Sequence, residues 1–192
     1  KKAIKIDPNH KDVFNNLGLI FKVLGDYKEA KKYFERAINI DPVHIVALNH
    51  LGIVFKEEGE FLKASNCFEK VISINSNDPD GHFNLGVLLY ETGQYENAIK
   101  EFKLISFKNS NSYLLSCLFK LDKKSSFYEV FDKRIKKSEK FDALLGSICL
   151  RSEIKYRTNI PNLFCKHPLD YVLNRDLTKV CDFDNTFIKT VK

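Results

Sequence analysis

The sequence predicts an all-α fold in which helix-turn-helix units stack into a right-handed solenoid. Three observations predict it. Leu-Gly pairs recur every 34 residues, each interval holds two stretches of apolar residues at helical spacing, and a glycine separates the two stretches. A hydrophobic fraction of 44% and a charged fraction of 29% are those of a folded chain.

Further positions recur at the spacing of the Leu-Gly pairs, which are Leu17-Gly18, Leu51-Gly52 and Leu85-Gly86. The columns they form are Gly25, Gly59 and Gly93; Tyr27, Phe61 and Tyr95; Ala30, Ala64 and Ala98; and Phe34, Phe68 and Phe102. Because one helical hairpin cannot cover its own apolar residues, such units stabilise one another by stacking.

Each unit contains signals that start and stop its two helices. One face of the first helix is formed by Phe14, Leu17, Gly18 and Phe21. Gly25 can supply the left-handed residue that ends this helix, and Asp26 with Glu29 forms a capping-box pattern for the second. The second helix is expected to bury Tyr27, Ala30, Phe34, Ala37 and Ile38. Pro42, directly after Asp41, is expected in the first turn of the following helix.

We expect the small residues to mark close helix contacts. Gly18 and Ala30 lack bulk where the two helices of one hairpin cross, and Phe34 is expected to fill the space towards the next unit.

This pattern resembles the tetratricopeptide repeat (TPR) family. The matching residues are Phe14, Leu17, Gly18, Phe21, Ala30, Phe34, Ala37 and Pro42. The resemblance implies a scaffold for protein-protein interaction. We expect the end of a truncated repeat at 1–10 and three TPRs at 11–44, 45–78 and 79–112.

The period weakens after residue 112. We interpret 113–157 as degenerate helical repeats that cap the array, with Ser126 and Glu129 as a capping box and Leu145-Gly146 as a remnant of the motif. The segment 158–192 is predicted to be a partly extended linker to a missing downstream domain. The sequence contains no Met and opens inside a repeat, so we expect it to be a fragment.

Charge and cysteine usage restrict the environment. Residues 1–112 carry 15 basic and 15 acidic side chains, whereas 113–192 carry 16 basic and 10 acidic ones. The five scattered cysteines form no C-x-x-C pair, which favours a reducing cytoplasm over a disulfide framework. No apolar run is long enough to span a membrane, and no signal peptide is visible.

Three local motifs offer candidate sites, but an ordinary structural role explains each of them better. His10-Lys11-Asp12 contains the His-x-Asp of an iron site, but it is predicted to be a turn between repeats. Cys165, His167 and Cys181 match no structural zinc spacing. A basic run could attract nucleic acid or anionic lipid, but a solvated helix face explains it better; its members are Lys133, Arg134, Lys136, Lys137 and Lys140. We therefore predict no enzyme activity and no cofactor for this chain.

The inner surface of the solenoid is the predicted site, because the first helix of each TPR lines it. The candidate peptide-binding residues are Asn15, Asn16, Lys22, Asn49, His50, Lys56, Phe83, Asn84 and Tyr90, with Leu19, Ile53 and Val87 completing a mixed groove. An amide both donates and accepts, so a row of Asn side chains can pair with a peptide backbone. The row resembles the asparagine ladder of the O-GlcNAc transferase TPR array, from which His50 departs. The simpler alternative is that Asn-Leu-Gly is common in TPRs. A carboxylate clamp of Lys and Asn, as in another TPR subclass, is not matched.

The tail suggests a second possible role. It resembles the linker of marine bacterial TPR proteins that carry a 2-oxoglutarate/Fe(II) oxygenase domain. The matching residues are Asn162, Phe164, Cys165, Pro168, Leu169, Asp170 and Tyr171. The predicted function is thus a scaffold that binds an extended peptide or a helix. The alternative is the substrate-recruiting arm of an oxygenase whose catalytic domain lies outside this chain. The predicted partner is a protein or peptide, not nucleic acid or membrane; the oligomeric state stays open.

Overall fold

The computed structural model describes residues 10–106, 109–135, 147–148, 151–152 and 155–156. The chain divides into two compact units between Leu121 and Asp122. The first unit contains the repeats and the candidate site.

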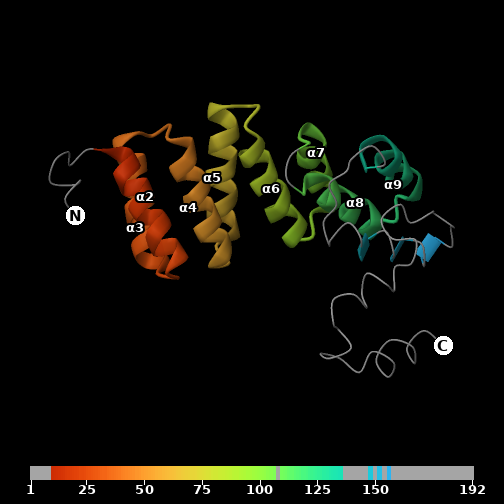
Figure 1. The fold of residues 1–192 in the computed structure, drawn as a ribbon, viewed down its shortest axis with the longest axis horizontal. Coiled ribbons are helices and arrows are strands. Elements are labelled where there is room, and N and C mark those ends of the chain that lie inside the picture. Colours follow the sequence, from red (N-terminus) through yellow and green to blue (C-terminus); the bar gives the residue numbers. More distant parts are fainter. Residues whose placement is uncertain (1–9, 107–108, 136–146, 149–150, 153–154, 157–192) are drawn as a thin grey trace, which may run out of the picture. The chain divides into compact units, whose positions relative to one another are not determined.

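The first unit is a series of antiparallel helical hairpins (Figure 1). Its helices are α2 (Lys11–Val23), α3 (Tyr27–Ile40), α4 (Ile45–Glu57), α5 (Phe61–Ile74), α6 (Pro79–Glu91), α7 (Tyr95–Leu104) and α8 (Ser110–Lys120). The starts of α2, α4 and α6 are 34 residues apart, as are those of α3, α5 and α7. Consecutive helices pack together, and α2, α4, α6 and α8 also contact one another in that order. The predicted all-α repeat architecture is confirmed.

The turn inside each hairpin has the predicted chemistry. Gly25, Gly59 and Gly93 have φ values of 78°, 77° and 78°, in the left-handed region that side chains other than glycine rarely adopt. The Asp26 side chain accepts a hydrogen bond from the Glu29 backbone N–H at 3.1 Å, which caps α3 as expected.

Close contact between glycine and phenylalanine explains the Leu-Gly column. A Cβ added to Gly18 would lie 2.6 Å from the ring of Phe34, and the corresponding distances are 2.5 Å for Gly52 with Phe68 and 2.7 Å for Gly86 with Phe102. The three rings are fully buried. Phe34 also belongs to a core cluster with Leu51 of the next repeat. It therefore packs within its own hairpin as well as towards the next unit.

The placement of Pro42 in a first helical turn was wrong. α4 begins at Ile45, and its N-cap is His44, whose Nδ1 accepts a hydrogen bond from the Ala47 N–H at 3.4 Å. Pro42 lies in the preceding turn, where the Asp41 carboxylate accepts from the Val43 N–H at 3.2 Å and holds the chain out of the helix. Pro79, by contrast, is the first residue of α6, behind the Asp78 cap.

The third repeat, formed by α6 and α7, is shorter than the first two. α7 has 10 residues where α3 and α5 have 14, and α8 starts at Ser110 instead of beyond residue 112. The degenerate segment therefore begins inside the interval predicted for the third repeat.

In the second unit, α9 (Lys124–Val130) continues into a π-helical turn, η1 (Phe131–Ile135). The predicted capping box at Ser126 was wrong, because the N-cap is Lys123 and Ser126 lies inside the helix. Asp122 has φ +56° and precedes α9 at the same spacing at which Gly25 precedes α3. Described helical residues follow at Ser147, Ile148, Arg151, Ser152, Lys155 and Tyr156. Leu145-Gly146 and the segment 158–192 lie outside the described residues.

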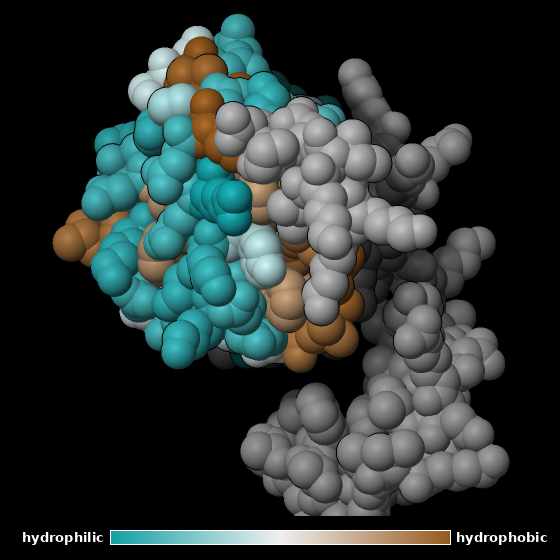
Figure 2. Space-filling view, turned by 90° about the vertical axis from the view of Figure 1, so that its left-hand side faces the viewer, coloured by the Kyte–Doolittle hydropathy of each residue, from teal (hydrophilic) through white to brown (hydrophobic). Residues whose placement is uncertain are grey.

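Among the described residues visible in Figure 2, most of the surface is hydrophilic, with local hydrophobic patches. The exposed large hydrophobic residues of the first repeat include Ile20, Val23 and Leu24. In the part of the chain that the structure describes, no helix is both long and apolar enough to cross a bilayer.

Candidate functional site

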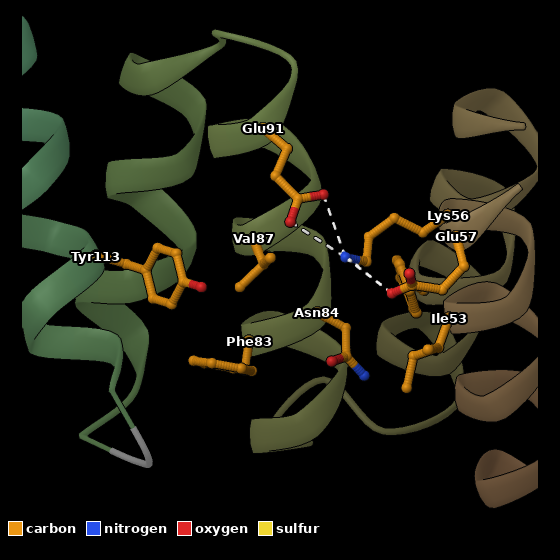
Figure 3. A pocket seen from close by; sticks show the side chains of 9 residues that line it. Ile53, Lys56, Glu57, Phe83, Asn84, Val87, Glu91 and Tyr113 are labelled. Carbon is orange, nitrogen blue, oxygen red and sulfur yellow. Dashed lines mark hydrogen bonds and ion pairs between the residues drawn. The ribbon is translucent and has the colours of Figure 1, made fainter. Parts of the chain in front are cut away.

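A pocket of about 230 Å³ opens between α4, α6 and α8 (Figure 3). Its lining residues are Ile53, Lys56, Glu57, Phe68, Phe83, Asn84, Val87, Glu91 and Tyr113. Three of the nine predicted groove residues are among them: Lys56, Phe83 and Asn84. The helices of this wall are those that contact one another across repeats, so the geometry of the pocket depends on repeat stacking.

One side of the pocket is aromatic. Phe83 and Tyr113 meet edge to face, with ring centroids 5.9 Å apart. The ring centroid of Tyr90, another predicted groove residue, lies 5.3 Å from that of Tyr113. Val87, between the aromatic side and Lys56, and Ile53, below Glu57 in Figure 3, add aliphatic surface to the pocket.

The rim of the pocket carries an ammonium group between two carboxylates. Lys56 Nζ lies 3.1 Å and 3.2 Å from the two oxygens of Glu91 and 3.5 Å from Oε1 of Glu57. Burial opposes the charge on Lys56, but the hydrogen bond and the Coulomb attraction to Glu91 outweigh it, so its pKa is raised. The ion pair joins α4 to α6 across the repeat boundary.

The predicted row of amides is partly engaged in stacking. Asn84 Nδ2 donates to Asn49 Oδ1 at 3.2 Å, and His50 Nδ1 lies 3.2 Å from Asn15 Oδ1. Both bonds join residues 35 positions apart, one step beyond the repeat length. Asn15 and Asn49 are buried, whereas Asn16 is exposed. The role of these side chains in peptide binding stays a prediction.

Burial and a neighbouring positive charge favour the neutral form of His50. Its pKa is lowered, first by burial and then by the nearby Lys22 ammonium. Since Asn15 Oδ1 can only accept, the His50 proton must be on Nδ1. His50 is thus a donor that fixes the contact between α2 and α4.

The sequence did not single out Tyr113, Glu57 or Glu91 for this site. Tyr113 lies in the segment where the period fails, so no column identified it. Glu57 and Glu91 share a column, and the spacing of 35 from Lys56 to Glu91 was the available signal.

The other motifs have structural contacts. Lys11 Nζ lies 2.5 Å from Asp41 Oδ2, and Asp12 Oδ1 lies 3.1 Å from His44 Nε2. The described residues contain no group of three His, Cys, Asp or Glu side chains that could hold a metal ion. In the basic run, Lys133 pairs with Glu129 at 2.8 Å. Cys165, His167 and Cys181 lie outside the described residues.

These features define the first unit as an α-solenoid with a pocket on its layer of first helices. Residues 12–44 match the family model described as tetratricopeptide repeat, and residues 52–93 match the model described as TPR repeat. Over these residues the chain is similar to tetratricopeptide repeats. A search among curated protein sequences gave no match.

Solved structures share the fold. One, from work on the functional characterization of Pseudomonas aeruginosa PilF, has a TM-score of 0.64 at 24% identity, covering 77% of this chain and 70% of that one. A crystal structure of the MamA protein has a TM-score of 0.62 at 19% identity, covering 83% of each chain. A second MamA crystal structure gives 0.58 at 18%, covering 82% of this chain and 86% of that one.

Proposed function

We propose that this chain is a protein-interaction scaffold that binds an extended peptide segment along the layer formed by α4, α6 and α8. The observation that carries the proposal is the pocket on this layer, which combines apolar and aromatic walls with an amide and a charged rim. Such a mixture allows a peptide side chain to be buried while polar groups fix its orientation.

The amides support recognition of a peptide backbone. The bond between Asn84 and Asn49 uses one N–H of Asn84 and leaves its Oδ1 at the pocket. A carbonyl oxygen can accept from a peptide N–H whatever the neighbouring side chain is. The proposed contribution of Asn84 is therefore backbone recognition.

Selection of phage-displayed random peptides on the chain tests this function. Ile53→Arg places a long charged side chain at the half-buried wall of the pocket. Leu62→Arg is the matched control, because Leu62 is 78% exposed and lies on α5 outside the pocket lining. We expect peptides that bind the wild type and Leu62→Arg but not Ile53→Arg. Peptides that bind all three chains equally would refute the groove.

We propose a binding role, not a catalytic one, and a bacterial cytoplasmic location. The location rests on cysteine usage and on the resemblance of the tail. The oxygenase-arm alternative depends on the tail, so the described residues add nothing in its favour.

A further inference from the structure

We propose that the pocket between α4, α6 and α8 receives an arginine side chain from an extended peptide. This inference rests on the proposed peptide-binding function and names the residue that the site selects. The argument uses the size of the pocket, the charge of its rim and the chemistry of its wall.

The size favours one side chain. The pocket holds about 230 Å³, below the roughly 300–1,000 Å³ of sites that enclose drug-sized ligands. An α-helix with its side chains is about 10–12 Å across and would have to lie over this pocket instead of entering it. An extended strand can insert a single side chain and continue along the layer.

The rim favours a positive charge. Glu57 and Glu91 supply two carboxylates against the single ammonium group of Lys56. The carboxylate side chains are 47% and 42% exposed, whereas that of Lys56 is 18% exposed. The neutralising charge is therefore the more buried one, and the two carboxylates are the more exposed charges of the rim. A carboxylate offers about four acceptor positions, more than one ammonium group occupies.

The wall favours a guanidinium group over a simple ammonium. Ile53 and Val87 offer aliphatic surface for the stem of a long side chain. Phe83 and Tyr113 supply aromatic surface to the same pocket. A planar guanidinium can stack on an aromatic ring and donate to a carboxylate in the same pose, which a compact, strongly hydrated ammonium does less well.

The test uses acetylated, amidated pentapeptides in which two alanines flank each side of a central residue. The central residue is arginine, lysine, citrulline or leucine, and citrulline keeps the shape of arginine without its charge. Binding to the full chain is followed by the NMR methyl signals of Ile53 and Val87. We expect the arginine peptide to bind about fivefold or more tightly than the citrulline and lysine peptides, the ratio expected for a partly desolvated cation–π and carboxylate contact.

Glu91→Gln is the matched variant, because it keeps the shape of the side chain and removes its charge. We expect it to lower the affinity for the arginine peptide to that of the citrulline peptide. The arginine assignment would be overturned if the leucine peptide bound as tightly as the arginine peptide, or if Glu91→Gln kept the same preference for arginine. Either result would leave the proposed groove in place. Methyl signals that move with none of the peptides would count against both the assignment and the groove.

Discussion

His82 Nδ1 lies 2.7 Å from Glu101 Oε2, and this pair occupies the two columns in which Phe14 and Tyr33 stack in the first repeat. His82 Nε2 lies 2.9 Å from the carbonyl oxygen of Ser76. A carbonyl and a carboxylate both accept, so the geometry favours an imidazolium that donates from both nitrogens. An ion pair has thus replaced an aromatic pair at one position of the repeat.

This replacement makes stability depend on pH. Burial opposes the charge on His82, but the bonds to Ser76 and Glu101 outweigh it, and its pKa is raised. Its stabilising contribution is therefore complete below the unfolded-state pKa of about 6.5 and is lost as pH rises through the folded-state value. The pH dependence from His50 runs the other way, because its pKa is lowered. Its contribution to stability is present above the unfolded-state pKa and is lost as pH falls through the folded-state value.

Single substitutions separate the two histidines. The unfolding free energy is measured by urea denaturation between pH 5 and pH 8 and plotted against pH. In His50→Asn we expect the slope of this plot to be more negative than in the wild type. His82→Phe places at position 82 the residue that Phe14 supplies in the first repeat. In this variant we expect the slope of unfolding free energy against pH to be more positive than in the wild type. Equal slopes in the wild type and His82→Phe would contradict the assignment of a charged His82.

Gly18→Ala tests the contact with the Phe34 ring. The new methyl group would lie 2.6 Å from ring carbons that are fully buried, so the ring or the helix must shift. We expect a loss of about 1–3 kcal/mol in unfolding free energy, as in other overpacked cores. Urea denaturation gives the value. An unaltered stability would show that the hairpin can relax without loss.

Gly25→Ala tests a different effect, because nothing lies within 4 Å of the added Cβ. The cost comes from the backbone alone, since φ is +78°, and should be about 1–2 kcal/mol. Gly25→Asn should recover part of it, because Asn tolerates the left-handed region. Equal losses for Ala and Asn would argue for a contact instead of a backbone effect.

Lys56→Gln separates the stability of the pocket from its affinity. Loss of the ion pair with Glu91 should lower the unfolding free energy by about 1 kcal/mol or less, since such pairs near the surface contribute little. Removal of the competing ammonium should raise the affinity for the arginine pentapeptide and increase its dependence on salt. A lower affinity of Lys56→Gln for the arginine pentapeptide would show that Lys56 itself forms part of the binding surface.

The described cysteines should react slowly in the folded state. Burial raises the pKa of Cys67 to about 11 and that of Cys117 to about 12, so neither thiol is ionised near neutral pH. We expect iodoacetamide to label both in urea but not in native buffer at pH 8, as read by peptide mass mapping. Rapid native labelling of Cys117 would indicate local opening of α8.

The columns at 34-residue spacing were enough to predict α2 to α7, because the turn at Gly25 and the contact of Gly18 with Phe34 both lie within one hairpin. The pocket could be predicted only in part. Tyr113 comes from a segment without the period, and the bonds of Asn49 and Lys56 reach residues 35 positions away, a register set by how repeats stack. Pro42 was expected in the first turn of a helix but lies in the turn before α4. The hydrogen bond of the Asp41 carboxylate with the Val43 N–H, which stabilises this turn, could not be predicted from the repeat pattern.

The bonds between successive first helices give the array a nearest-neighbour character. His50 with Asn15, Asn84 with Asn49, and Glu91 with Lys56 each cross a single boundary between repeats. If unfolding starts at one end, each boundary between repeats adds its own free-energy cost, as in a one-dimensional chain of coupled units. A peptide lying across α4 and α6 would raise the step at their boundary, so ligand binding would be measurable as slower amide exchange in two repeats at once.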